Sequence, residues 1–139
     1  MAKIEDRDRV IRAYLLGRTW DANPEFGLVR ALATSVHPDL ATYPYLYNYE
    51  WEVQPGFSNA GCGDLVLTDG SGNFAVVEAK FIDVGRTGPT VRVKRTKSRS
   101  QVRDQALTYA DALRRILGVE AISVRAFSLT NESGLVEER

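Results

Sequence analysis

Asp64, Glu78 and Lys80 are spaced so that together they could bind a divalent cation and a phosphate. Two short apolar runs flank the segment 69–73, which is dense in turn-forming residues, and this pattern predicts a β-hairpin. If the hairpin is symmetric about Ser71, Asp64 lies opposite Glu78 and projects to the same side of the sheet. Glu78 and Lys80 share that side because side chains alternate along a strand. We therefore expect two carboxylates and an ammonium group at one end of the hairpin.

Two acids that face each other across a sheet repel, so the pair needs a physical reason. A hard cation such as Mg²⁺ would remove the penalty, since it prefers one or two carboxylates together with water and phosphate oxygens. Lys80 would then supply positive charge for a phosphate or an attacking water. A salt bridge among half-exposed residues at a sheet edge fits the same spacing, and the spacing alone does not decide between the two.

The pattern resembles the PD-(D/E)XK nuclease superfamily, in which an acid opens one strand and an acid-x-lysine motif lies on the next. Gly63-Asp64 and Glu78-Ala79-Lys80 match these motifs, and the segment from Gln105 to Tyr109 matches the Q-x-x-x-Y helix signature of the RecB-type branch. The resemblance covers roughly residues 24 to 131. It implies a restriction-endonuclease-like core with the element order α-β-β-β-α-β.

The resemblance also implies a set of site residues. Asp64, Glu78 and the Ala79 carbonyl would hold one or two Mg²⁺ or Mn²⁺ ions, and Lys80 would position the attacking water or the scissile phosphate. Gln105 and Tyr109, one helical turn apart, would orient the lysine.

Glu25 is the best-placed candidate for a further metal-binding acid, because superfamily members often carry one on the helix before the sheet. Its position in the first turn of a helix also has a sufficient structural reason, since a carboxylate is favourable there. Glu5, Glu50 and Glu52 are the rival candidates.

Local signals predict the first two helices. Residues 3–16 form a helix that a glycine ends. A second helix begins at Asn23-Pro24, with asparagine as its cap and proline in its first turn, and stops before His37. Its apolar face is predicted to contain Leu28, Leu32 and Val36.

A run of odd-numbered aromatic residues precedes the hairpin and would line one face of an extended segment. We expect a strand near the sheet edge over 46–53, with Tyr49 and Trp51 in the core. For Tyr43 and Tyr45, packing and stacking on bases both remain open. The run consists of Tyr43, Tyr45, Tyr47, Tyr49 and Trp51.

In the second half of the chain, Ser98 or Ser100 could cap a helix that runs to Leu117. A closing strand is predicted over 121–129, and the polar residues 131–139 are predicted to fray. The helix has an apolar stripe formed by Val102, Ala106, Ala110, Leu113 and Leu117. Together these elements predict a single α/β domain over 1–139, with a mixed central sheet flanked by helices and an extra N-terminal helix.

Residues 86–103 contain seven basic side chains and no acidic one, although the chain as a whole has 18 basic and 18 acidic residues. Such a cluster neutralises phosphates, and we predict that it binds the phosphates of the nucleic-acid backbone. A merely solvated loop is the alternative. The seven residues are Arg86, Arg92, Lys94, Arg95, Lys97, Arg99 and Arg103.

Composition limits the other classes of function. One cysteine excludes an internal disulfide, and one histidine leaves no Cys/His zinc cluster. The sequence shows no membrane-spanning run and no signal peptide, so we expect an intracellular, non-secreted protein with no membrane partner.

We expect a metal-dependent nuclease that hydrolyses the phosphodiester bonds of nucleic acid, with DNA favoured as the substrate and RNA left open. A homodimer is one way for so small a chain to gain recognition surface. A nuclease fold that only binds nucleic acid or serves as an interaction module is the alternative. An enzyme acting on other phosphate-containing substrates is a third hypothesis.

Overall fold

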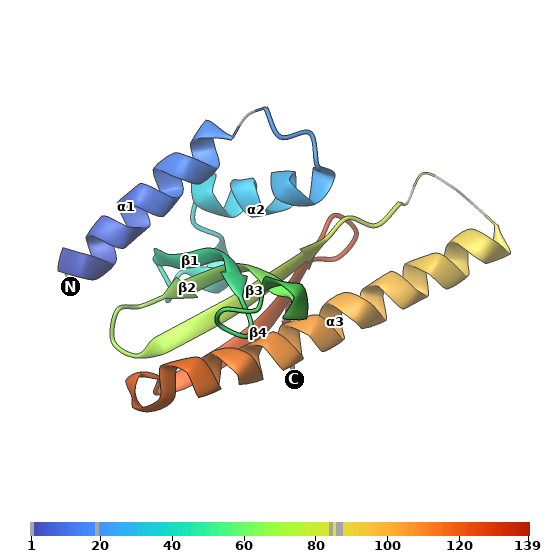
Figure 1. Cartoon of the computed structure of the whole chain (residues 1–139). Helices are drawn as coiled ribbons and strands as arrows, with labels where there is room; N and C mark the ends of the chain where they lie inside the picture. The colour runs from blue at the N-terminus through green and yellow to red at the C-terminus, as the bar shows by residue number, and fades with distance from the viewer. Residues whose placement is uncertain (1, 19, 84, 86–87) are drawn as a thin grey trace.

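A five-stranded mixed sheet separates two helical layers, with α1 and α2 on one face and α3 on the other (Figure 1). The computed structural model describes residues 2–18, 20–83, 85 and 88–139. The strands, adjacent in chain order, are β1 (Tyr45–Glu52), β2 (Cys62–Thr68), β3 (Asn73–Lys80), β4 (Ser123–Thr130) and β5 (Gly134–Glu138). The helices are α1 (Ala2–Gly17), α2 (Pro24–Thr34) and α3 (Pro89–Leu117), with short 3₁₀ turns at 38–40, 58–60 and 118–120. The predicted α/β class and the extra N-terminal helix are confirmed.

The register of the β2–β3 hairpin is the predicted one. Leu65 pairs with Val77 and Thr68 pairs with Phe74 in an antiparallel ladder. Asp69 stabilises the turn by accepting hydrogen bonds from the backbone N–H groups of Ser71 and Asn73. β3 is parallel to β4, and α3 makes the connection between them.

The central strands are buried on both faces, as expected for a sheet covered by helices. Leu65 and Val77 belong to the core beneath α1 and α2, whereas Val66 and Val76 belong to the core beneath α3. All five residues of the predicted apolar stripe on α3 are buried. Among the described residues, no helix is long and apolar enough to cross a membrane.

Three sequence predictions about element ends are wrong. α3 begins at Pro89 rather than near residue 98, since proline is favourable in a first turn and no helix breaker follows it, so the basic segment is helical. Residues 134–138 are not frayed but form β5, which pairs with β4 and covers its edge. α2 ends at Thr34, and Val36 is 58% exposed, so the helix buries Val29 and not Val36.

The aromatic residues before the hairpin do not share one face. Tyr43 and Tyr49 pack toward α1 and α2, while Tyr47 and Trp51 pack toward α3. A register shift between Leu46 and Asn48 and a positive φ of 45° at Glu50 interrupt the alternation of β1.

Candidate active site

The structure brings Asp64 and Glu78 together at the end of the β2–β3 hairpin. The backbone N–H of Asp64 donates to Oε2 of Glu78 at 2.9 Å. The backbone N–H of Ala79 donates in turn to Oδ2 of Asp64 at 2.8 Å. The regular ladder stops at the Leu65–Val77 pair, and these two carboxylates continue the connection between the strands.

Burial makes the negative charge of this pair unfavourable. Glu78 is only 2% exposed, and burial raises its pKa from 4.5 to about 9, with a further increase from the Asp64 carboxylate. Burial also raises the pKa of Asp64 from 3.8 to about 6, against the opposing hydrogen bond from the Ala79 N–H. Glu25 and Glu50 raise this pKa further, whereas Lys80 lowers it.

One oxygen of each carboxylate is left for another partner. Within the described part of the chain, Oδ1 of Asp64 and Oε1 of Glu78 accept no hydrogen bond from protein. In the same residues, no group of three or more His, Cys, Asp or Glu side chains is arranged to hold a metal ion. The carboxylate donors gathered here are therefore a pair and not a closed cage.

Lys80 and Glu25 meet beside the pair. Nζ of Lys80 lies 3.4 Å from Oε1 of Glu25, and both side chains are more than one third exposed. Asn23 caps α2 by accepting from the N–H of Glu25, which fixes the first turn that carries this acid.

The rival acids differ in where they lie. Glu50 reaches the same site and raises the pKa of Asp64. Glu5 is exposed on α1, and Glu52 lies on a different groove beside α3. Compared with these three rivals, Glu25 is therefore the acid best placed next to both Asp64 and Lys80.

A polar cavity of about 110 Å³ adjoins the pair. Arg18 stands on its wall with Asp21, Glu25, Glu50 and Asp64, and its guanidinium hydrogen-bonds the carboxylates of Asp21 and Glu50. Arg18 has no motif around it in the sequence, and its partner Glu50 lies on a distant strand with an unusual backbone, so the residue was not predicted as part of the site.

α3 brings Tyr109 close to the two acids. Its ring stands edge-on to Trp51, with centroids 6.1 Å apart. Burial raises the pKa of its hydroxyl, and the charges of Glu78 and Asp64 raise it further, so this hydroxyl lies within electrostatic reach of both acids. Gln105 is exposed one turn away, and the structure shows no hydrogen bond between it and Lys80.

Gly63, immediately before Asp64, packs directly against Trp51. A Cβ atom at Gly63 would lie 2.2 Å from Nε1 of Trp51 and 2.4 Å from its Cε2. The indole Nε1 is itself buried without a hydrogen-bond partner. Only a residue without a side chain therefore allows the indole to occupy this place.

Gly63→Ala is accordingly expected to lower the free energy of unfolding by roughly 1–3 kcal/mol, the usual cost of overpacking. Urea denaturation measures the change. Gly27→Ala is the matched control, because a Cβ there meets nothing within 4 Å and alanine is favoured over glycine in a helix by roughly 0.5–1 kcal/mol. Wild-type stability for Gly63→Ala would contradict the packing argument.

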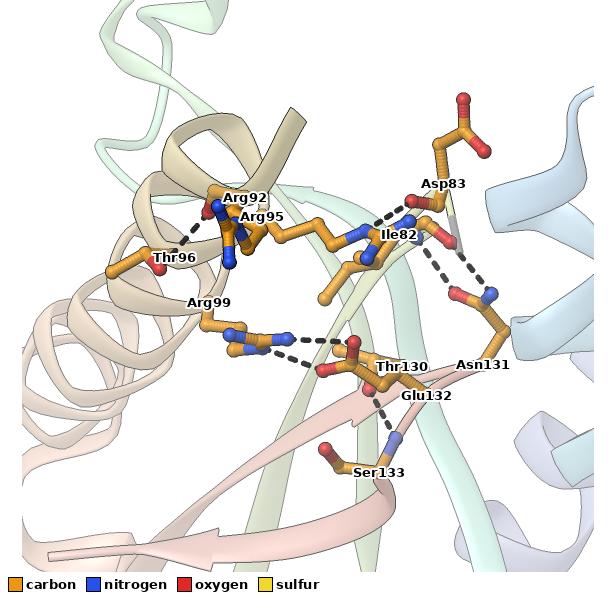
Figure 2. A network of polar contacts seen from close by, with 10 residues as sticks. All are labelled: Ile82, Asp83, Arg92, Arg95, Thr96, Arg99, Thr130, Asn131, Glu132 and Ser133. Carbon is orange, nitrogen blue, oxygen red and sulfur yellow. Dashed lines mark hydrogen bonds and ion pairs between the residues drawn. The ribbon is translucent and has the colours of Figure 1, made fainter. Parts of the chain in front are cut away.

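The predicted basic residues lie on the N-terminal half of α3, except Arg86, which is outside the described residues. Arg99 binds both oxygens of Glu132 at 2.5 and 2.7 Å, and Nε of Arg95 donates to the Asp83 carbonyl at 2.6 Å (Figure 2). Arg92, Lys94, Lys97 and Arg103 are exposed on the same stretch of helix.

Comparison with family models, curated proteins and solved structures finds no match for this chain. The assignment of a function therefore depends on the residues and the geometry described above.

Proposed function

We propose that this protein is a metal-dependent nuclease with a restriction-endonuclease-like fold, which hydrolyses phosphodiester bonds of nucleic acid, DNA rather than RNA. The observation that carries the proposal is the pair formed by buried Glu78 and half-buried Asp64, with Lys80 beside it. A structural sheet gains nothing from two such acids, whereas a site for a cation and a phosphate needs them.

The element order supports the proposed fold. α2, β1, β2, β3, α3 and β4 follow one another in the α-β-β-β-α-β order that the sequence resemblance implies. β3, which carries Glu78 and Lys80, lies at the centre of the sheet, with β2 and Asp64 next to it. Tyr109 of the Q-x-x-x-Y segment approaches the same two acids from α3.

The donor set fits Mg²⁺ or Mn²⁺. Mg²⁺ commonly binds one or two protein carboxylates and completes its coordination with water and substrate phosphate oxygens, so a pair of acids is sufficient. Asp64 and Glu78 would hold the ion, with the Ala79 carbonyl and Glu25 as further candidates. A cation also offsets the burial and the negative neighbours that raise the pKa values of both acids.

Hydrolysis forms a bond from a water oxygen to phosphorus and breaks the bond to the leaving sugar oxygen, which takes up a proton. A bound Mg²⁺ supplies Lewis acidity for the phosphate and lowers the pKa of water. Lys80 places its ammonium beside Asp64 and stabilises the charge that develops on the phosphate. Glu25 positions Lys80 through their contact, and Tyr109 and Gln105 complete the α3 side of the site.

A cleavage assay tests the proposal directly. The purified chain with Mg²⁺ or Mn²⁺ is expected to cut at least one member of a panel of single-stranded, duplex and branched DNA and RNA. EDTA should stop the reaction, and Asp64→Asn should abolish it because the amide is a much weaker cation ligand. Cleavage that persists in EDTA, or in Asp64→Asn, would overturn the assignment.

One observation favours a second candidate, a catalytically silent module that binds nucleic acid. The described residues contain no group of three metal-binding side chains. Metal titration separates the two candidates, because only the nuclease should gain Mg²⁺-dependent thermal stability that Asp64→Asn removes.

A further inference from the structure

A groove of about 390 Å³ runs between α3 and strands β4 and β5. Eight of its ten lining residues carry a hydroxyl or a charged group, and the other two are valines. Hydroxyl and guanidinium groups come from Thr96, Arg99, Ser100 and Arg103 on α3 and from Thr130 and Ser133 on the sheet side. The volume of the groove suits a short segment of a single nucleic-acid strand, since pockets of roughly 300–1,000 Å³ bind drug-sized ligands.

The groove begins beside the candidate active site. β3 and β4 pair in parallel register, with Glu78 opposite Ser128 and Lys80 opposite Thr130. Neighbouring strands are about 4.8 Å apart, and paired residues project to the same face. Ser128 and Thr130, which both line the groove, are thus the immediate neighbours of Glu78 and Lys80.

Arginines form a stripe on one face of α3, and two of them, Arg99 and Arg103, line this groove. Arg92, Arg99 and Arg103 are seven and four residues apart, which places them on one face of the helix. From Arg92 to Arg103 the helix rises about 16 Å, enough for several successive phosphates of one strand. Lys94 and Lys97 lie toward the other side of the helix.

We propose that this groove binds the phosphodiester backbone of the strand being cut, on the phosphates next to the scissile one; the inference rests on the proposed function. The hydroxyls of Ser100, Thr130 and Ser133 donate to phosphate oxygens, whereas the Thr96 hydroxyl already donates to the Arg92 carbonyl. The guanidinium groups bind phosphate oxygens in the two-pronged manner that arginine favours. The contacts are to backbone atoms, so the groove positions the strand without reading its sequence.

Two acids oppose an anion in the groove. Glu132 holds Arg99 with both carboxylate oxygens, and the guanidinium lowers the pKa of Glu132 (Figure 2). Glu138 lines the groove and accepts a hydrogen bond from the Ser128 hydroxyl at 2.6 Å. A phosphate that binds Arg99 must displace the Glu132 carboxylate, so Glu132 competes with the strand.

Fluorescence anisotropy with a labelled single-stranded oligodeoxynucleotide in EDTA tests the groove without any cleavage. The double variant Arg99→Ala/Arg103→Ala is expected to raise Kd by about tenfold or more, since each charge-assisted contact contributes one or more kcal/mol. The slope of log K against log salt should fall by about 1–2. Arg115→Ala, which removes one guanidinium group from the far end of α3, should change Kd less than twofold.

Glu132→Gln provides a test of opposite sign. It frees Arg99 and should lower Kd by about threefold to tenfold, whereas Glu120→Gln, an exposed acid beyond the C-terminal end of α3, should not. Equal effects of the groove variants and their controls would overturn the inference. Failure of the nuclease assignment shows separately, as absent cleavage, because the binding assay contains no metal.

Discussion

Lys80→Ala is expected to reduce kcat for nucleic-acid cleavage by about 10²–10³-fold while KM changes little, the usual result of removing one group that stabilises transition-state charge. Among the described residues, Lys80 is the cation whose charge lowers the pKa of Asp64, and its side chain is partly exposed beside Glu25. Its loss removes positive charge where the phosphate gains negative charge. Single-turnover cleavage under saturating Mg²⁺ measures the effect.

Lys3→Ala is the matched control, because it removes the same charge from the exposed face of α1, on the far side of the molecule from α3. It should cleave like the wild type. Thermal denaturation must show that Lys80→Ala is folded, which we expect since the lost ion pair with Glu25 is a half-exposed one. Full cleavage by a folded Lys80→Ala variant would remove Lys80 from the mechanism.

The hairpin could be predicted from sequence because its information is local. The turn formers at 69–73 fix the register, and the register alone determines that Asp64 and Glu78 meet. The apolar stripe of α3 is equally local, since helical periodicity marks Ala106 and Ala110 as buried.

The remaining features depend on contacts that are distant in sequence. β5 forms only because the edge of β4 is available to pair with a polar segment. Trp51 packs against Gly63 after two irregularities in β1, the register shift between Leu46 and Asn48 and the positive φ of Glu50. The residues next to Trp51 in the sequence do not predict these irregularities. Arg18 lies on the wall of the site, and its partner Glu50 on β1 is 32 residues away in sequence, so no spacing rule could have found this contact.

The candidate site also contains carboxylates whose charged forms destabilise the folded state. Glu78 is buried and Asp64 is half-buried, and desolvation of each carboxylate raises the free energy of the folded state in its charged form. Destabilising residues of this kind are expected at functional positions, where the residues that the chemistry requires are not the ones that stabilise the fold. The destabilisation therefore has a measurable consequence in the dependence of stability on pH.

In EDTA, the free energy of unfolding is expected to fall as pH rises from about 4.5 to about 9. The pKa of Glu78 is 4.5 when unfolded and about 9 when folded, so in this interval the folded state holds a proton that unfolding releases. Stability is therefore greatest at the acidic end of the interval and lost toward the alkaline end. Asp64 adds to the slope between 3.8 and about 6. The total loss should be on the order of a few kcal/mol.

Glu78→Gln should remove most of this slope, because the amide does not titrate, whereas Glu5→Gln on the exposed surface of α1 should keep it. Urea denaturation at a series of pH values measures the slopes. Mg²⁺ binds the charged form of the pair, so it should stabilise the wild type more at pH 8 than at pH 6 and should not stabilise Glu78→Gln. The contradicting result is a parallel loss of stability in the wild type and in Glu78→Gln as pH rises. It would mean that Glu78 does not hold the proton in the folded state, and it would remove the support for the carboxylate pair as the cation site.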